Sequence, residues 1–227
     1  MPRIPAALAA LLSLAALPAS ARAADRVWHR DRAVCEKLYL DKIHRTPLAE
    51  RDRLEVLLRL GPDSGAPPGT PPPTLTIDAK GGPIRVAPGP EGFVAFPVTD
   101  ALLAEDPVVL TSMPEGQKTS VSLEIRPVRP ASTSFPLAEL MASVPQANKL
   151  IKAQAGFFSF AVPTLKAVLL VYPPGAPQTA RLIAPGVERT IAADANGHLR
   201  IPRDEPLEGA GARVELSAPP LRLELDE

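Results

Sequence analysis

The sequence has few of the residues from which metal and redox sites are built. It contains one cysteine, Cys35, and three histidines, no two of which lie three or four positions apart. One cysteine forms no internal disulfide and no zinc cage. We therefore expect no metal and no cofactor. Cys35 either keeps a free thiol or pairs with another molecule, and we favour a partly buried thiol without a role.

Motifs of known enzyme classes are also missing. The chain has no G-x-S-x-G element and no glycine-rich loop between a strand and a helix, which argues against a hydrolase of that type and a phosphate cradle. Asp194–Gly197 begins like a calcium loop but lacks its later ligands, so a hairpin turn fits better. We expect a protein without enzymatic activity. The alternative is an enzyme whose site is assembled from scattered residues, with His44, His198 or Cys35 near a polar pocket.

Neither an excess of charge nor many aromatic side chains are present. Lysine plus arginine and aspartate plus glutamate each number 25, and aromatic residues make up 4%. Without Arg3 and Arg22, which fall in the leader described next, 23 basic and 25 acidic side chains remain, a net charge of −2. This balance excludes nucleic acid and anionic membranes as expected partners. The scarcity of tryptophan and tyrosine also weakens a sugar-binding function.

The first 23 residues read as a cleavable secretory signal peptide. Arg3 supplies the positive start, Ala6–Leu17 is an apolar run, and Ala21–Ala23 gives a small-residue cleavage site. The run is shorter than the roughly 20 apolar residues of a spanning helix, so an uncleaved anchor is the weaker alternative. We expect a periplasmic protein, with full secretion as the alternative, and not an integral membrane protein.

Beyond the leader, composition and pattern favour β-structure. The 29 prolines and 14 glycines fit strand ends, edges and turns rather than long helices. Two segments, 54–130 and 166–227, repeat the same order of apolar runs. Gly92–Pro97 matches Gly197–Pro202, and the closing runs 121–125 and 221–225 both alternate with period two. We interpret them as two tandem small β-sandwich units, mainly β in class, joined by a short helical, phenylalanine-rich linker.

The linker, residues 131–165, carries apolar side chains at the spacing of an amphipathic helix: Leu137, Leu140, Met141 and Val144. Pro145 predicts a kink or two short helices, with Ser143 as a cap of the second. Three phenylalanines follow: Phe157, Phe158 and Phe160. They could form a partner surface, although we favour a role in packing one unit on the other. Residues 24–53 form a charged N-terminal segment, in which the apolar side chains within 38–43 indicate a strand or a short helix.

The run Ala195–Pro202 resembles the hairpin of transthyretin-like, carboxypeptidase-regulatory sandwich modules. The wider layout, with Leu150–Gly156 and Pro163–Lys166 before the second repeat, resembles an uncharacterised family of exported proteobacterial proteins. The resemblance implies a sandwich fold and an exported location, and it implies no functional residue.

These observations favour an exported, periplasmic, non-enzymatic protein that acts as a binding or assembly module. Edge strands of sandwich units accept partner strands, so we expect another envelope protein as a partner. An enzyme with a scattered site and an envelope structural protein are the alternatives.

Overall fold

The computed structural model describes residues 25–67, 69–89, 91–155 and 163–227. Its 14 strands form four antiparallel sheets, and its helices are few and short. The prediction of a mainly β protein is therefore confirmed. Within the described ranges no helix has the length and apolar character needed to cross a bilayer.

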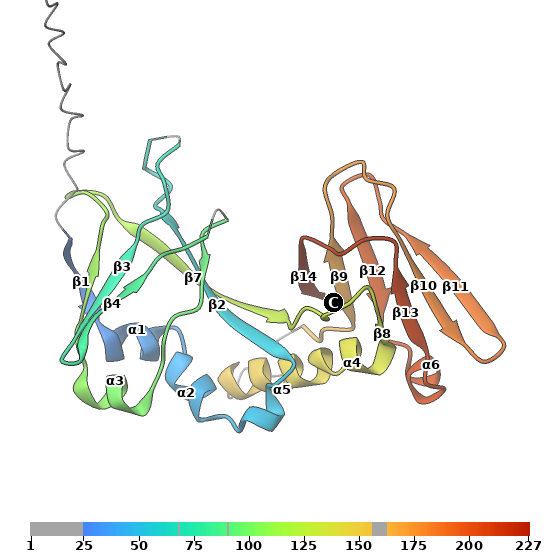
Figure 1. The fold of residues 1–227 in the computed structure, drawn as a ribbon. Helices are drawn as coiled ribbons and strands as arrows, with labels where there is room; N and C mark the ends of the chain where they lie inside the picture. Colours follow the sequence, from blue (N-terminus) through green and yellow to red (C-terminus); the bar gives the residue numbers. More distant parts are fainter. Residues whose placement is uncertain (1–24, 68, 90, 156–162) are drawn as a thin grey trace, which may run out of the picture.

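The elements up to residue 127 form the N-terminal half of the molecule (Figure 1). Its strands are β1 (Arg26–Arg30), β2 (Leu54–Pro62), β3 (Leu75–Ala79), β4 (Gly82–Val86), β5 (Phe93–Val94), β6 (Val108–Thr111) and β7 (Thr119–Pro127). Its helical elements are α1 (Asp31–Lys37), α2 (Leu40–Arg45), the short 3-10 turn η1 (Leu48–Glu50) and α3 (Asp100–Glu105).

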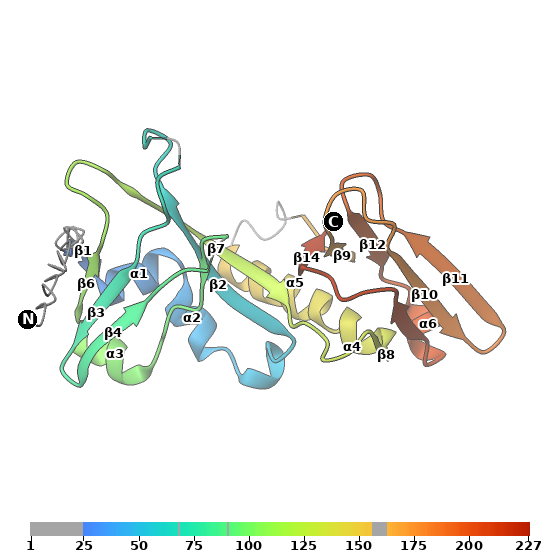
Figure 2. The same cartoon turned by 45° about the horizontal axis from the view of Figure 1, so that its top comes forward.

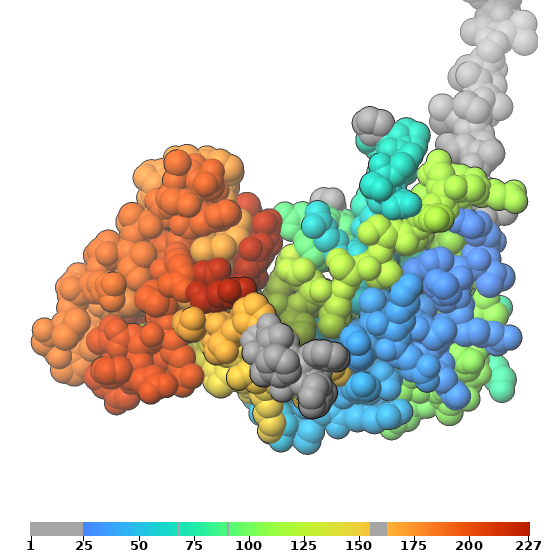
Figure 3. Space-filling view, turned by 180° about the vertical axis from the view of Figure 1, so that it is seen from behind, coloured from blue at the N-terminus to red at the C-terminus, as the bar shows by residue number. Residues whose placement is uncertain are grey.

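The C-terminal half has a matching set of elements. Its strands are β8 (Ser134–Pro136), β9 (Ala167–Val171), β10 (Thr179–Ala184), β11 (Val187–Ala192), β12 (His198–Pro202), β13 (Arg213–Leu216) and β14 (Arg222–Asp226). Its helices are α4 (Leu137–Met141), α5 (Ser143–Ala155) and α6 (Glu205–Gly209). Figures 2 and 3 show the two halves side by side, with α5 running beside both.

Strand order is the same in the two halves. The first half has sheets β1-β6-β3-β4 and β5-β2-β7, and the second has β8-β13-β10-β11 and β12-β9-β14. Strands from both sheets of a half contribute to one apolar core, with Leu58 and Ile77 in the first and Leu170 and Leu182 in the second. The side chains that line these cores alternate along each strand because successive residues point to opposite faces.

Equivalent loops are held by equivalent hydrogen bonds. The amide of Leu60 donates to the carbonyl of Gly92 at 2.8 Å, and the amide of Tyr172 donates to the carbonyl of Gly197 at 2.8 Å. Both glycines have positive φ, 83° and 81°. A Cβ at these positions would lie 2.5 Å from the oxygen of Leu60 and 2.3 Å from that of Tyr172. In each half, the close approach of these two backbone segments therefore requires glycine.

A second pair of matching contacts joins the start of one strand to the end of its neighbour: β3 to β6 in the first half and β10 to β13 in the second. The amide of Thr74 donates to Oγ of Ser112, and the amide of Thr179 donates to Oγ of Ser217, each at 2.9 Å. Thr179 and Ser217 each lie 105 positions after their counterparts in the first half, as Gly197 does after Gly92. The two segments 74–112 and 179–217 therefore correspond without insertion or deletion.

The strands extend beyond the limits that the sequence pattern suggests. β1 lies before residue 54 and pairs with β6, while β8 lies within the expected linker and pairs with β13. Each half thus starts with a strand, followed by two helices, before its longest run of β-structure. Their short lengths and weak alternation explain why neither strand was predicted.

The expected helix around Leu137–Val144 is two helices, α4 and α5, which meet at Ala142. Pro145 lies in the first turn of α5, where a missing amide hydrogen costs no helical hydrogen bond. Ser143 is the first residue of α5 rather than the residue that precedes it, and its Oγ donates to the carbonyl of Leu140 at 2.7 Å. The break therefore precedes the proline.

The α5 helix connects the two halves through a small apolar cluster. Ala147 and Leu150 pack with Ile43 and Leu54 of the first half, and with Leu225 of β14. Strands β7 and β14 also lie alongside each other. The halves therefore contact each other through one helix and two sheet edges.

Candidate functional site

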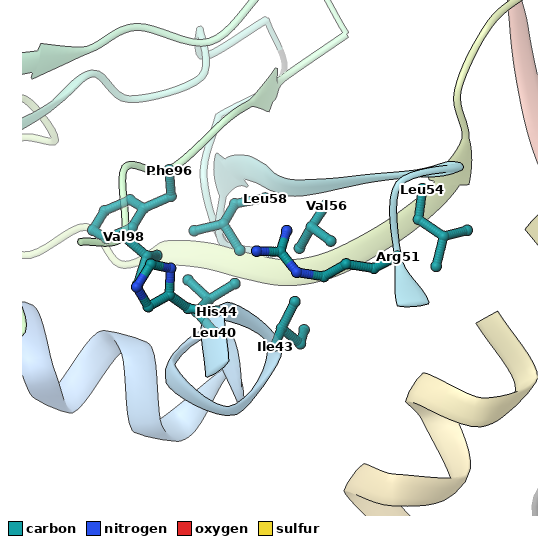
Figure 4. A pocket seen from close by; sticks show the side chains of 9 residues that line it. All are labelled: Leu40, Ile43, His44, Arg51, Leu54, Val56, Leu58, Phe96 and Val98. Atoms are coloured by element: carbon teal, nitrogen blue, oxygen red, sulfur yellow. The ribbon is translucent and has the colours of Figure 1, made fainter. Parts of the chain in front are cut away.

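A pocket of about 240 Å³ opens on the N-terminal half, between α2, β2 and the segment from β5 to α3 (Figure 4). Seven of its nine lining side chains are apolar and two are basic. The nine are Leu40, Ile43, His44, Arg51, Leu54, Val56, Leu58, Phe96 and Val98. Apolar walls with a few polar groups are the usual composition of a ligand site.

Regular secondary structure positions the apolar walls. Leu54, Val56 and Leu58 occupy alternate positions of β2, so their side chains share one face of the sheet. Leu40 and Ile43 lie three positions apart on α2 and face the same direction. The walls therefore come from a strand that is buried in the core and a helix packed over it, which gives the pocket a rigid floor.

His44 lies at one end of the pocket, near Phe96 and Val98 in Figure 4. Its Nε2 is 3.2 Å from Oδ1 of Asp100, a side chain that is 94% exposed. Asp100 is the first residue of α3, whose start is fixed because Oγ1 of Thr99 accepts a hydrogen bond from the amide of Leu102 at 3.1 Å. The imidazole is therefore anchored at the rim by a solvated carboxylate.

Arg51 extends its guanidinium over the apolar wall of the pocket (Figure 4). Its Nε donates to the carbonyl of Thr46 at 3.1 Å. The backbone is held on both sides, since the amide of Arg51 donates to Leu48 and its carbonyl accepts from the amide of Leu54. Among the described residues no carboxylate forms an ion pair with Arg51. The pocket thus contains a positioned cation without a counter-ion.

Three lining residues of the pocket have counterparts in the C-terminal half. Leu170 and Ile201 are the counterparts of Leu58 and Phe96, and both are fully buried. Met141 of α4, also fully buried, packs in the same core. The counterpart of Val98 is Arg203, which pairs with Glu205 and Glu208. At the position of Val98, the second half therefore has a charged, ion-paired side chain in place of an apolar one.

A second group of polar side chains is buried at the start of α1. Asp31 and Cys35 are both 0% exposed, and Sγ of Cys35 lies 3.9 Å from Oδ2 of Asp31. Burial, with the charge of Asp106 second, raises the pKa of Asp31 to about 6. Burial and the neighbouring carboxylates raise the pKa of Cys35 to about 12. Burial and the raised pKa both favour the protonated, less reactive form of the thiol.

Other residues from the sequence search do not assemble into a site. Phe157, Phe158 and Phe160 lie outside the described residues. His198 belongs to β12 of the C-terminal half, away from the pocket that His44 lines. Within the described parts of the chain, no three His, Cys, Asp or Glu side chains are grouped as metal ligands. Of the enzyme candidates His44, His198 and Cys35, His44 lines the pocket beside α2.

The Asp194–Gly197 segment is a tight turn, but not the hairpin that the sequence favoured, because it joins β11 and β12, which belong to different sheets. Oδ1 of Asp194 accepts hydrogen bonds from the amides of His198 at 2.8 Å and Asn196 at 2.9 Å. These hydrogen bonds to the charged carboxylate, the one from His198 first, lower the pKa of Asp194. The carboxylate is therefore engaged by its own turn.

Sequence reasoning did not identify Arg51 as a site residue. The residue lies in a charged stretch, and nothing in its neighbourhood marks it as facing an apolar wall. The alternation of 54–60 does indicate one apolar face, but a sequence does not show which helix covers that face. Comparison with known proteins gives no match to a family model, to a curated protein or to a solved structure.

Proposed function

We propose that this chain is an exported, non-enzymatic binding protein built of two tandem β-sandwich units, and that the pocket beside α2 is its binding site. The observation that carries the proposal is the pocket itself, in which apolar walls from α2 and β2 meet a basic side chain without a counter-ion. Such a composition suits the capture of a small ligand.

Support for two units comes from the repeated strand order and the repeated contacts of Gly92 and Gly197. The duplicated unit, on this proposal, includes the strand and two helices that precede each longer β-segment, so β1 and β8 are counterparts. After an internal duplication, one copy can acquire a binding function while the other copy serves the stability of the fold. The pocket of the first half, and the ion-paired Arg203 at the equivalent of Val98 in the second half, fit that division.

Support for a non-enzymatic role comes from the chemistry of the lining. Among the described residues, the pocket walls contain no serine, threonine or cysteine that could act as a nucleophile. His44 contacts a carboxylate that is almost fully exposed, whereas catalytic bases are usually oriented by buried partners. The described residues thus give His44 a rim position and no reacting partner.

Export rests on the leader of residues 1–23 and is tested by fractionation. The full chain, produced in a Gram-negative host, should be released with the periplasm and should have a mass that starts at Ala24 or a near neighbour. A full-length mass, or recovery from the cytoplasm, contradicts export.

Binding at the pocket is tested with 1-hexanol, a neutral apolar probe. Methyl resonances of Ile43, Leu58 and Val98 should shift on titration, and the Val98→Phe variant, which fills the pocket, should abolish the shifts. Val128→Phe, at an exposed position away from the pocket, is the matched control. Absence of shifts in the wild-type protein contradicts the binding function.

A further inference from the structure

We propose that the pocket beside α2 takes a short aliphatic monocarboxylate, with its carboxylate on the guanidinium of Arg51 and its alkyl chain against Leu58 and Phe96. The inference rests on the proposed binding function and names the class of ligand. It follows from the charge, the size and the polar inventory of the pocket.

The positive charge of Arg51 favours an anionic ligand. The guanidinium of Arg51 has one hydrogen bond, from Nε to the carbonyl of Thr46, so its terminal nitrogens remain available for a bidentate contact with a carboxylate. Two other half-buried arginines do have a carboxylate: Arg53 pairs with Glu139, and Arg222 pairs with Glu224. Beside an apolar wall the guanidinium attracts an anion more strongly than it does in water.

Among the described residues, Asp100 is the one carboxylate that forms a hydrogen bond or ion pair with a lining side chain. It is 94% exposed and bonded to His44, so solvent screens its repulsion of a bound anion. His44 therefore separates this negative charge from the interior of the pocket. Arg51 is therefore the guanidinium that lines the pocket itself.

Size limits the ligand to a short chain. An apolar cavity of about 150 Å³ accommodates benzene, so a pocket of about 240 Å³ accommodates about eight to ten non-hydrogen atoms by the same proportion. Hexanoate, with its carboxylate and an unbranched alkyl chain, falls in this range. A larger acid would leave part of its chain in water.

The small number of polar side chains in the pocket favours a free acid over the C-terminus of a peptide. A peptide brings amide groups at each residue, and a buried amide without a partner is costly. The side chains that line the pocket offer only His44 and Arg51 as polar partners, and His44 already contacts Asp100. A fatty acid has no other polar group to satisfy.

The test compares three probes of equal chain length: hexanoate, 1-hexanol and hexylammonium, each titrated into the mature protein while the methyl resonances of Ile43, Leu58 and Val98 are followed. Hexanoate should bind at least about 10-fold more tightly than 1-hexanol, as expected for one charge-assisted contact, and hexylammonium should bind most weakly. The Arg51→Gln variant should reduce hexanoate affinity about 10-fold and leave 1-hexanol affinity unchanged.

Arg85→Gln is the matched control, because it removes the same charge from an exposed position on β4. It should leave both affinities unaltered. Equal binding of hexanoate and 1-hexanol in the wild-type protein, or equal loss in the two arginine variants, overturns the ligand class and leaves the binding function standing. No shift with any probe overturns both. Thermal unfolding of each variant shows whether it is folded.

Discussion

At the scale of single residues, Asp31 is the side chain whose environment most opposes its charge. It is 0% exposed, its Oδ1 has no hydrogen-bond partner among the described residues, and its pKa is raised to about 6 by burial first and by Asp106 second. In the unfolded chain the pKa returns to about 4. The folded protein therefore binds the proton more tightly, and its stability falls as pH rises from about 4 to about 6.

The Asp31→Asn variant should remove this penalty. Above pH 6 the wild-type carboxylate is charged in the folded state, so the variant should raise the free energy of unfolding by about 1–3 kcal/mol at pH 7.5. Below pH 4 both states of the wild-type protein are protonated, and the difference should vanish. Urea unfolding at pH 7.5 and pH 3.5 measures both values. An equal effect at the two pH values contradicts a titrating Asp31.

The thiol of Cys35 should be unreactive in the folded protein. It is 0% exposed and its pKa is raised to about 12, first by burial and second by Asp31, so neither access nor thiolate is available at neutral pH. A thiol reagent at pH 8 should label the native protein more than about 100-fold more slowly than the protein in urea. A disulfide-linked dimer on a non-reducing gel contradicts this expectation, because it requires an accessible sulfur.

At the scale of elements, the two matching turns depend on their glycines. Gly197→Ala should destabilise the protein by about 2–4 kcal/mol, since a left-handed conformation costs about 1–2 kcal/mol and the added Cβ would lie 2.3 Å from the oxygen of Tyr172. Gly186 is the control: its φ is also positive, 72°, but nothing lies within 4 Å of a Cβ there. Gly186→Ala should cost about 1–2 kcal/mol, and equal losses in thermal unfolding contradict the steric account.

The element scale also shows how far the sequence determines the fold. The alternation in 121–125 and 221–225 predicted the strands β7 and β14, because a strand with one buried face has a period of two. The short strands β1 and β8 were not predicted, because they pair with partners that lie about 80 residues away in sequence. Such pairing depends on the tertiary fold rather than on local pattern.

The candidate site was less predictable than the strands. His44 was named as a candidate because histidines are few, and the structure places it at a pocket. Arg51 depends on how η1 turns the chain between α2 and β2, which its own sequence does not indicate. Which helix covers a given face of a sheet, and therefore which side chains line the space between them, is known only from a structure.

At the scale of the whole molecule, α5 holds the two halves together. Ala147 is fully buried between them, while Ala153 on the same helix is exposed. Ala147→Arg should therefore disrupt the contact, because a long charged side chain cannot enter a closed apolar cluster. We expect a larger radius of gyration by small-angle X-ray scattering and two thermal transitions in place of one.

Ala153→Arg, the matched control, should leave the scattering profile and the transition unchanged. Ion pairs across the same contact, such as Lys149 with Glu50 at 2.7 Å, are exposed and contribute little. High salt alone should therefore not separate the halves. Separation in high salt with no effect of Ala147→Arg contradicts an apolar junction.

The central claim is that the pocket beside α2 binds a short aliphatic carboxylate through Arg51. A crystal structure of the mature protein with hexanoate tests this claim most directly. The account predicts the carboxylate against the guanidinium of Arg51 and the alkyl chain between Leu58 and Phe96. Hexanoate bound elsewhere, bound with its carboxylate away from Arg51, or absent at saturating concentration would contradict it.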